Sequence, residues 1–175
     1  MNDGFNILNN FAKKKDSMQI NIEERVMSAR IFFVSGYNCA QAVALAYEDI
    51  VELDAQTIAK LTASFGGGLS RLREVCGAVS GMAFVAGALI PANDPLNLTA
   101  KHENYALMQH FAEEFRKENG SIICRELLGL TQPKDDPKPS ERTTEYYRKR
   151  PCVEYVATAA RIIGEYIVSN FEKNL

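Results

Sequence analysis

The chain has 175 residues, 46% of them hydrophobic, and a formal net charge of −2. A chain of this length and apolar content normally folds as one domain around one core. Basic and acidic residues nearly balance, so the composition gives no electrostatic sign of binding to nucleic acid or to an anionic membrane surface. We predict neither partner.

Residues 1–19 are polar and are predicted to form a flexible N-terminal tail. They contain the basic run Lys13–Lys15 but lack the apolar stretch and the small-residue cleavage site of a signal peptide. We therefore expect a cytoplasmic protein whose helical domain spans residues 20–175. The longest uncharged run, residues 75–93, is rich in Gly and Ala and is interrupted by Pro91. This favours a buried core helix over a membrane span.

Helical periodicity and capping signals divide the domain into about six or seven helices. The first four are predicted over residues 20–34, 39–50, 55–64 and from 74 or 76 to 90. Asn38 and Asp54 are good N-caps for the second and third of these. The glycines at 66–68 are expected to end the third helix and to begin a Gly-rich loop.

Three further helices are predicted over residues 98–117, 121–128 and 151–171. The first of them is amphipathic, and its expected apolar stripe consists of Tyr105, Met108, Phe111, Ala112 and Phe115. Residues 132–149 are rich in proline and charge and show no periodicity, so they are predicted to be an exposed connector. No segment alternates like a strand. The fold class is therefore all-α, a single-domain helical bundle.

Each of the four cysteines falls in or near the first turn of a predicted helix: Cys39, Cys76, Cys124 and Cys152. Each also begins the apolar stripe of its helix, so all four should point inward. Short connections make successive helices antiparallel, which places the first three cysteines at one end of the bundle. A connector of about twenty residues, at ~3.3 Å per residue, is long enough to bring Cys152 there. The sequence therefore predicts one cluster of thiols.

Thiols at this place are expected to be reactive. The N-terminus of a helix carries partial positive charge, which stabilises a thiolate and lowers the pKa of a cysteine. We therefore take all four cysteines as candidate catalytic residues, with Cys76, beside Gly77, expected to be the least obstructed. Gly77 and Arg73 are the candidate cofactor-binding residues. Several basic residues could add to the effect or could be ordinary solvated charge: Arg71, Arg73, Arg125 and 148–150.

A family resemblance rests on two short segments, residues 65–68 and 74–81. Residues 36–39 before them and Cys124 and Cys152 after them complete the pattern. Over about residues 20–170 the chain resembles the C_GCAxxG_C_C family of redox-active proteins, which is named for its cysteine pattern. In that pattern Gly directly precedes the second cysteine, whereas this chain has Val75 there.

The resemblance implies a helical fold and a redox role for Cys39, Cys76, Cys124 and Cys152. A similar domain occurs in a split-Soret type of cytochrome, which implies iron as a partner. The chain has no C-x-x-C-H motif, so covalently attached haem is not expected.

Three functions stay open at this stage. The first is thiol–disulfide chemistry, in which one thiolate attacks a disulfide or another oxidant and a second cysteine resolves the adduct. The second is an iron–sulfur binding or electron-transfer protein with four cysteine ligands, or less readily a zinc protein, because zinc ligands usually come in closely spaced pairs. The third is a helical interaction module whose cysteines are structural. The sequence does not identify the redox partner, which could be a protein or a small oxidant. It also leaves open whether the protein forms a homodimer.

Overall fold

The computed structural model describes residues 20–132 and 134–171. The predicted N-terminal tail lies outside these residues. Within them every regular element is a helix, and β pairing is limited to one isolated antiparallel bridge between Val75 and Ile123. The predicted all-α class is confirmed. No helix in this part is both long and apolar enough to cross a bilayer.

The helices are more numerous and shorter than predicted. In chain order they are α2 (Ile22–Val34), α3 (Cys39–Leu45), α4 (Glu48–Val51), α5 (Ala55–Leu61), the 3-10 helix η2 (Ala63–Phe65), α6 (Gly66–Leu69), α7 (Gly77–Leu89), α8 (Leu98–Asn119), α9 (Cys124–Leu127), α10 (Thr144–Lys149) and α11 (Cys152–Phe171). The predicted second helix splits at Tyr47. This tyrosine is fully buried, and its hydroxyl donates to the carbonyl of Ala160 at 2.6 Å.

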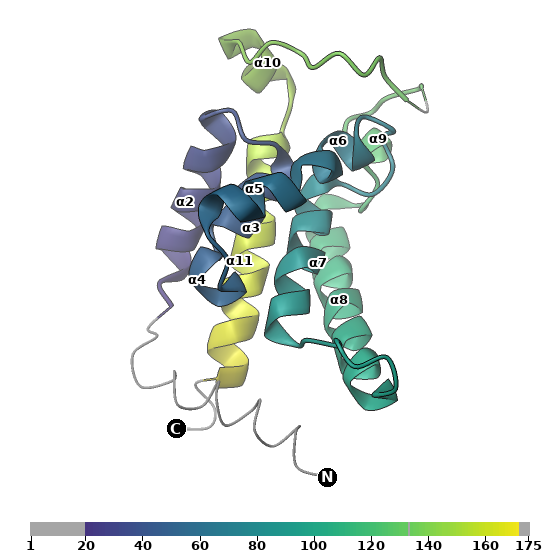
Figure 1. Cartoon of the computed structure of the whole chain (residues 1–175). Coiled ribbons are helices and arrows are strands. Elements are labelled where there is room, and N and C mark those ends of the chain that lie inside the picture. The colour runs from purple at the N-terminus through teal and green to yellow at the C-terminus, as the bar shows by residue number, and fades with distance from the viewer. Residues whose placement is uncertain (1–19, 133, 172–175) are drawn as a thin grey trace.

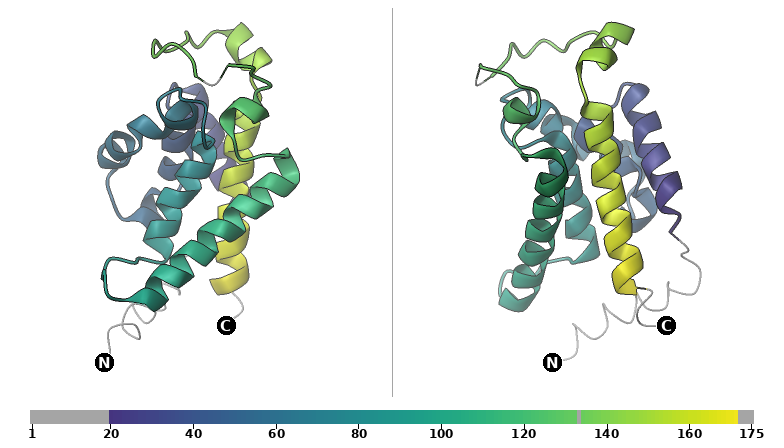
Figure 2. Two further views of the ribbon diagram at one scale, coloured as in Figure 1. Left: turned by 90° about the vertical axis from the view of Figure 1, so that its right-hand side faces the viewer. Right: turned by 180° about the vertical axis from the view of Figure 1, so that it is seen from behind.

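The long helix α11 runs through the bundle, with α2 along one side and α7 and α8 along the other (Figures 1 and 2). α3 packs on α7 and also contacts α11. The core between these helices is aliphatic and aromatic and includes Val43, Met82, Phe111, Val156 and Ile163. α7 and α11 both begin at the upper end of Figure 1 and run downward, which gives the bundle one end rich in helix N-termini.

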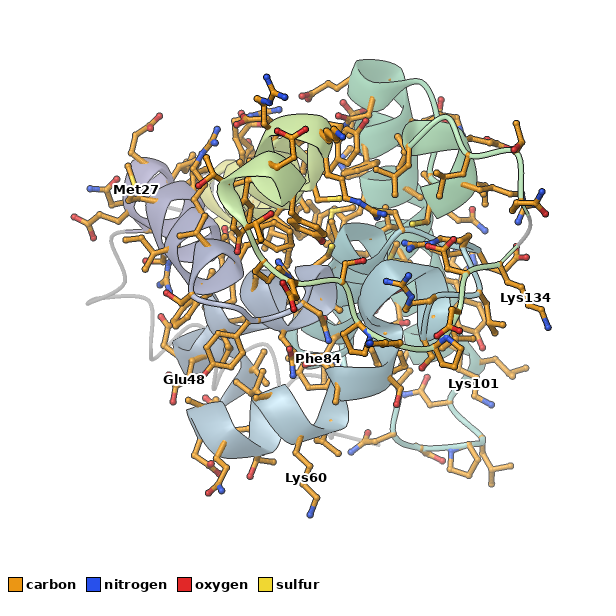
Figure 3. All side chains as sticks on the ribbon, turned by 90° about the horizontal axis from the view of Figure 1, so that it is seen from above. Met27, Glu48, Lys60, Phe84, Lys101 and Lys134 are labelled. Carbon is orange, nitrogen blue, oxygen red and sulfur yellow. The ribbon has the colours of Figure 1, made fainter. Side chains whose placement is uncertain are left out.

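Two sequence predictions need correction. Residues 132–149 are not simply an exposed connector, because they contain α10, whose Tyr146 and Tyr147 are half-buried and pack against the core. Figure 3 shows α10 and the chain around it lying across the upper end of the bundle. On α8, Tyr105 is 63% exposed and lies off the predicted stripe, and Leu107 is buried instead.

The close packing of α3 on α7 depends on a glycine. A Cβ added at Gly81 would lie 2.8 Å from the Cβ of Val43 and 3.0 Å from the carbonyl oxygen of Ala40. Gly87, two turns along the same helix, has open space at the corresponding point. The loss of helix propensity at Gly81 is therefore offset by helix contact.

We predict that Gly81→Ala lowers the free energy of unfolding by about 1–3 kcal/mol, because the new methyl group separates α3 from α7. Gly87→Ala is the matched control, and it should leave stability unchanged or raise it by up to about 1 kcal/mol. Urea unfolding followed by circular dichroism measures both. Equal effects of the two substitutions would contradict the packing argument.

Candidate functional site

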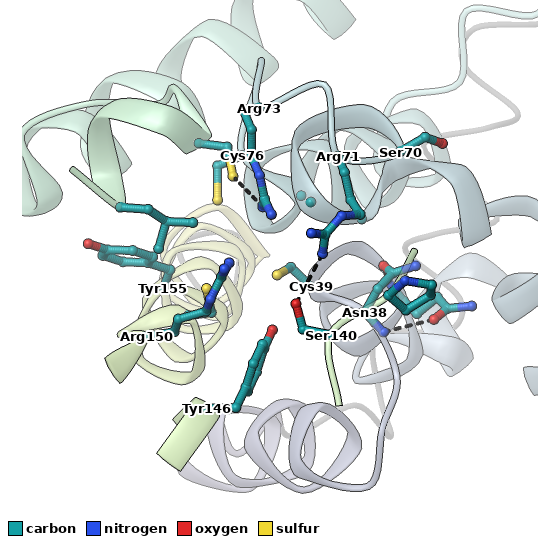
Figure 4. Close-up of a pocket in the computed structure, with 18 of the residues that line it drawn as sticks. Asn38, Cys39, Ser70, Arg71, Arg73, Cys76, Ser140, Tyr146, Arg150 and Tyr155 are labelled. Carbon is teal, nitrogen blue, oxygen red and sulfur yellow. Dashed lines mark hydrogen bonds between the residues drawn. The ribbon is translucent and has the colours of Figure 1, made fainter. Parts of the chain in front are cut away.

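A cavity of about 490 Å³ opens at the end of the bundle where the helices begin, and all four cysteines line it. Cys39, Cys124 and Cys152 are the first residues of α3, α9 and α11, and Cys76 is the N-cap of α7. Figure 4 shows the Cys39 sulfur pointing into this cavity. The structure thus brings together the four residues that the sequence singled out.

Cys39 is held in place by the cap of α3. The Asn38 side chain accepts from the backbone amides of Ala40 and Gln41, while Gln41 Oε1 accepts from the Asn38 amide at 2.8 Å. The Asn38 side chain also donates to the carbonyl of Ala63 at 2.9 Å. These bonds fix the start of α3 against η2. As a residue Cys39 is half-buried, whereas the other three cysteines are buried.

Cys76 and Cys124 are placed by the backbone bridge between Val75 and Ile123. The Cys76 amide donates to the carbonyl of Ile122 at 2.8 Å, and the Cys124 amide donates to the carbonyl of Glu74 at 2.6 Å. The bridge covers Cys76, which is only 5% exposed. The expectation that Cys76 is the least obstructed thiol was therefore wrong. Ile123 is extended here as the N-cap of α9, so the helix begins at Cys124, later than predicted.

Two glycines make the approach of these elements possible. A Cβ at Gly77 would lie 3.0 Å from the Cβ of Cys39 and 3.0 Å from the carbonyl oxygen of Phe65. A Cβ at Gly68 would lie 2.7 Å from the Cβ of Cys124. Gly77 therefore forms part of the cavity wall, where its lack of a side chain leaves room for Cys39.

The glycine loop is wound in an unusual way. Residues 67–71 all have positive φ, and three of them are not glycine: Leu69 (61°), Ser70 (49°) and Arg71 (67°). This single left-handed turn replaces the loose loop that the sequence predicted. It is closed by backbone bonds from Ser70 to Ser64 (2.8 Å) and from Glu74 to Gly68 (3.1 Å). A strained turn of this kind needs support from its surroundings.

Support comes from the two arginines that follow the glycines. Arg73 is 3% exposed, donates through Nη1 to the Cys124 sulfur at 3.7 Å, and forms an ion pair with Asp135. Arg71 donates to the same carboxylate at 3.1 Å and to the Ser140 hydroxyl at 3.3 Å (Figure 4). Asp135 thus ties the residues after α9 to the left-handed turn. Its bond to Arg73 lowers the pKa of this carboxyl.

Four arginines line the cavity: Arg71, Arg73, Arg142 and Arg150. Arg142 was missed by sequence reasoning because it lies in the segment taken as an exposed connector, and only the fold brings it to the cysteines. Two other basic candidates point elsewhere. Arg125 pairs with Glu74 at 2.9 Å, and Arg148 pairs with Glu145 at 2.7 Å.

The family model described as "Putative redox-active protein (C_GCAxxG_C_C)" matches residues 37–166. The chain belongs to this family. The match contains all four cysteines and the whole lining of the cavity apart from Gly36. No curated protein and no solved structure matches the chain.

In this C_GCAxxG_C_C protein the four thiols do not have equal acidity. Burial raises the pKa of Cys76 to about 12, and burial also raises the pKa of Cys124, although the bond from Arg73 opposes the shift. The thiols of Cys39 and Cys152 influence each other directly: the interaction between the two side chains lowers the pKa of Cys152 to about 7 and raises the pKa of Cys39.

The charge around Cys152 acts in the same direction as this interaction. Arg150, Arg142 and Arg73 add to the stabilisation of its thiolate, against the opposing effect of burial. Cys152 is therefore the more acidic thiol of the pair, and Cys39 is the one that keeps its proton. In the described residues all four cysteines are free thiols.

The same thiols were also considered as ligands for an iron–sulfur cluster or zinc. Nowhere in residues 20–132 or 134–171 are three or more Cys, His, Asp or Glu side chains grouped so that they could hold a metal ion. The four sulfurs share a cavity, but as they stand they do not form a ligand set. Gly77 and Arg73, the predicted cofactor-binding residues, lie in the cavity wall.

We predict that alkylation of Cys152 follows a titration curve with a midpoint near pH 7, because the interaction with Cys39 stabilises its thiolate. Cys39→Ala removes this interaction, so the midpoint should rise toward the ordinary value for cysteine, about 8.5. Cys76→Ala is the control and should leave the midpoint in place. Peptide-resolved iodoacetamide labelling over a pH series measures this. An unchanged midpoint in Cys39→Ala would show that Cys39 does not lower the pKa of Cys152.

Proposed function

We propose that this protein performs thiol–disulfide chemistry, with Cys152 as the attacking thiolate and Cys39 as the resolving thiol. One observation carries most of the weight: two cysteines from distant parts of the chain, at the starts of α3 and α11, line one cavity and shift each other's pKa. A thiolate with a pKa near the ambient pH combines a high ionised fraction with good nucleophilicity.

The reaction balances without any further reagent. The Cys152 thiolate attacks one sulfur of a substrate disulfide RSSR, a Cys152–SR bond forms, and RS⁻ leaves and takes up a proton. Cys39 then loses its proton and attacks the Cys152 sulfur, which releases the second RS⁻. Overall two protein thiols are oxidised to one disulfide and RSSR is reduced to two RSH. The reverse sequence would oxidise a dithiol substrate.

Cys76 and Cys124 have a different place in this scheme. Burial keeps both protonated near neutral pH, so they should react slowly with a disulfide. Both also line the cavity, next to the reactive pair. They are suited to a second, slower dithiol, and the Arg73 bond makes Cys124 the more acidic partner.

The rival functions make different demands on the same residues. A metal or cluster protein needs at least three ligands around one point, which the side chains as placed do not supply. A purely structural role for the cysteines leaves the lowered pKa of Cys152 and the cavity beside it without a purpose. Thiol–disulfide chemistry uses both features.

The direct test is oxidation of the reduced protein, purified without oxygen, by oxidised glutathione or diamide. We expect loss of the Cys39 and Cys152 thiols first, formation of the Cys39–Cys152 disulfide in a peptide map, and full recovery with dithiothreitol. Cys152→Ser should abolish the disulfide, and Cys124→Ala, the control, should retain it.

Two outcomes would overturn the proposal. Four thiols inert toward both oxidants would exclude reversible thiol chemistry. Near-stoichiometric iron and sulfide in the anaerobically purified protein, or stoichiometric zinc, would assign the cysteines to a metal site instead.

A further inference from the structure

The cavity beside the cysteines contains cationic charge that the protein does not neutralise. Of its four arginines, Arg71 and Arg73 share Asp135. Arg142 and Arg150 are half-buried, and neither has a carboxylate partner among the described residues. Arg142 donates to backbone carbonyls and stacks on Phe33, with 4.6 Å from its guanidinium carbon to the ring centre.

Arg150 lies over the ring of Tyr146, with 5.3 Å from its guanidinium carbon to the ring centre, and it also acts electrostatically on Asp135 and Cys152. In Figure 4 its guanidinium points into the cavity from the side opposite Arg71. No aspartate or glutamate in the described part of the chain lines the cavity. The walls thus present positive charge, sulfur and neutral side chains.

The lack of an ion pair is peculiar to Arg142 and Arg150 among the arginines of the described residues. Every other arginine in the described residues has an Asp or Glu partner: Arg25, Arg30, Arg71, Arg73, Arg116, Arg125, Arg148 and Arg161. Several of these pairs lie on open surface, where an ion pair adds little. Arg142 and Arg150 are less exposed than Arg148 yet lack a partner. The Cys152 thiolate and, at longer range, Asp135 offset part of this charge. Two half-buried guanidinium groups without an ion pair still leave the cavity positive, so an external anion would be bound favourably there.

We infer that the substrate is a small disulfide, or its thiol product, that carries carboxylate or similar anionic groups, and that Arg142 and Arg150 bind those groups beside Cys39 and Cys152. This inference rests on the proposed thiol–disulfide function and names its substrate class. A cavity of about 490 Å³ lies in the range of small-molecule sites. Arg71 is a third donor toward the same space (Figure 4).

The arginines have an alternative role that the experiment must separate from substrate binding. Arg150 and Arg142 also stabilise the Cys152 thiolate. If that were their whole purpose, removing them would slow every thiol reagent by the same factor, because only the thiolate fraction would change. Anion binding instead affects charged and neutral reagents differently. The ratio of their rates cancels the thiolate fraction and reports binding alone.

The test compares iodoacetate, which is anionic, with iodoacetamide, its neutral analogue of nearly equal size. Second-order rates are measured by mass spectrometry at Cys39 and Cys152, and the iodoacetate-to-iodoacetamide ratio is divided by the ratio for the urea-unfolded chain. We expect a normalised ratio of roughly ten or more in the folded protein, from the attraction of one carboxylate to two nearby guanidinium groups. The double variant Arg142→Gln/Arg150→Gln should bring it close to one.

Three controls make the result specific. Arg148→Gln removes an exposed arginine on α10, between Arg142 and Arg150 in sequence and paired with Glu145, and should keep the high ratio. Arg142→Lys keeps the positive charge but loses the packing of the guanidinium on Phe33. It should keep most of the ratio, because the ratio depends on charge and not on this packing. Circular dichroism verifies that each variant is folded, and the iodoacetamide rate verifies that it has a reactive thiol.

A normalised ratio near one in the folded protein, or a high ratio that survives the double substitution, would overturn the inference. Neither reagent requires a disulfide to form, so this result is independent of the test of function. If the Cys39–Cys152 disulfide forms but anionic reagents are not preferred, the proposed function stands and the substrate class is wrong. If anionic reagents are preferred but no disulfide forms, the anion site stands and the disulfide chemistry is wrong.

Discussion

The bridge between Val75 and Ile123 is the contact on which the site depends. Two short stretches, separated by nearly fifty positions in sequence, exchange backbone hydrogen bonds at 2.8 and 2.6 Å. α9 has a single turn and would be unstable alone, because so short a helix cannot recover the cost of its nucleation. Tied to the segment before α7, it holds Cys124 over Cys76 and closes one side of the cavity.

The same bridge accounts for the left-handed turn that precedes it. Each non-glycine residue in this conformation costs about 1–2 kcal/mol, and Leu69, Ser70 and Arg71 all adopt it. The turn is enclosed between the end of η2 and the bridge, and its arginines are bound by Asp135 and Ser140. The strain therefore has a function: it directs Arg71 and Arg73 toward the cysteines rather than toward solvent. Gly68 supplies the space that Cys124 needs beside the turn.

The sequence predicted the parts of this structure that are local. The periodic patterns of α2, α7 and α11 predict these helices correctly, and that of α8 does so apart from Tyr105, which lies off the buried face. Antiparallel topology then places helix N-termini, and so the cysteines, at one end. α10 was missed because only two of its six residues are apolar, Tyr146 and Tyr147, which is too few to show a helical pattern. Their burial depends on a contact with a distant helix, the packing of Tyr147 against Phe33.

The acidity of the thiols was beyond the reach of the sequence for a related reason. All four cysteines begin or cap helices, so the helix argument treats them alike. Their pKa values differ because of tertiary contacts. Cys152 interacts with Cys39 and lies near three arginines, whereas Cys76 is buried. Arg142, which acts on both the thiolate and the cavity, comes from a stretch with no helical pattern. Differences of this kind arise from contacts between distant segments.

The arginines also resolve a conflict that thiolate chemistry creates. A thiolate that attacks an anionic molecule must approach a like charge, and two unit charges about 5 Å apart at an effective dielectric constant near 20 repel each other by ~3 kcal/mol. Cations on both sides of the pair offset this repulsion and stabilise the thiolate before attack. After transfer, the same cations stabilise the departing thiolate, which improves it as a leaving group. In the proposed reaction one arrangement of charge thus serves the nucleophile, the substrate and the leaving group, which gives the two arginines without an ion pair a reason to lie beside Cys152 and not on the open surface.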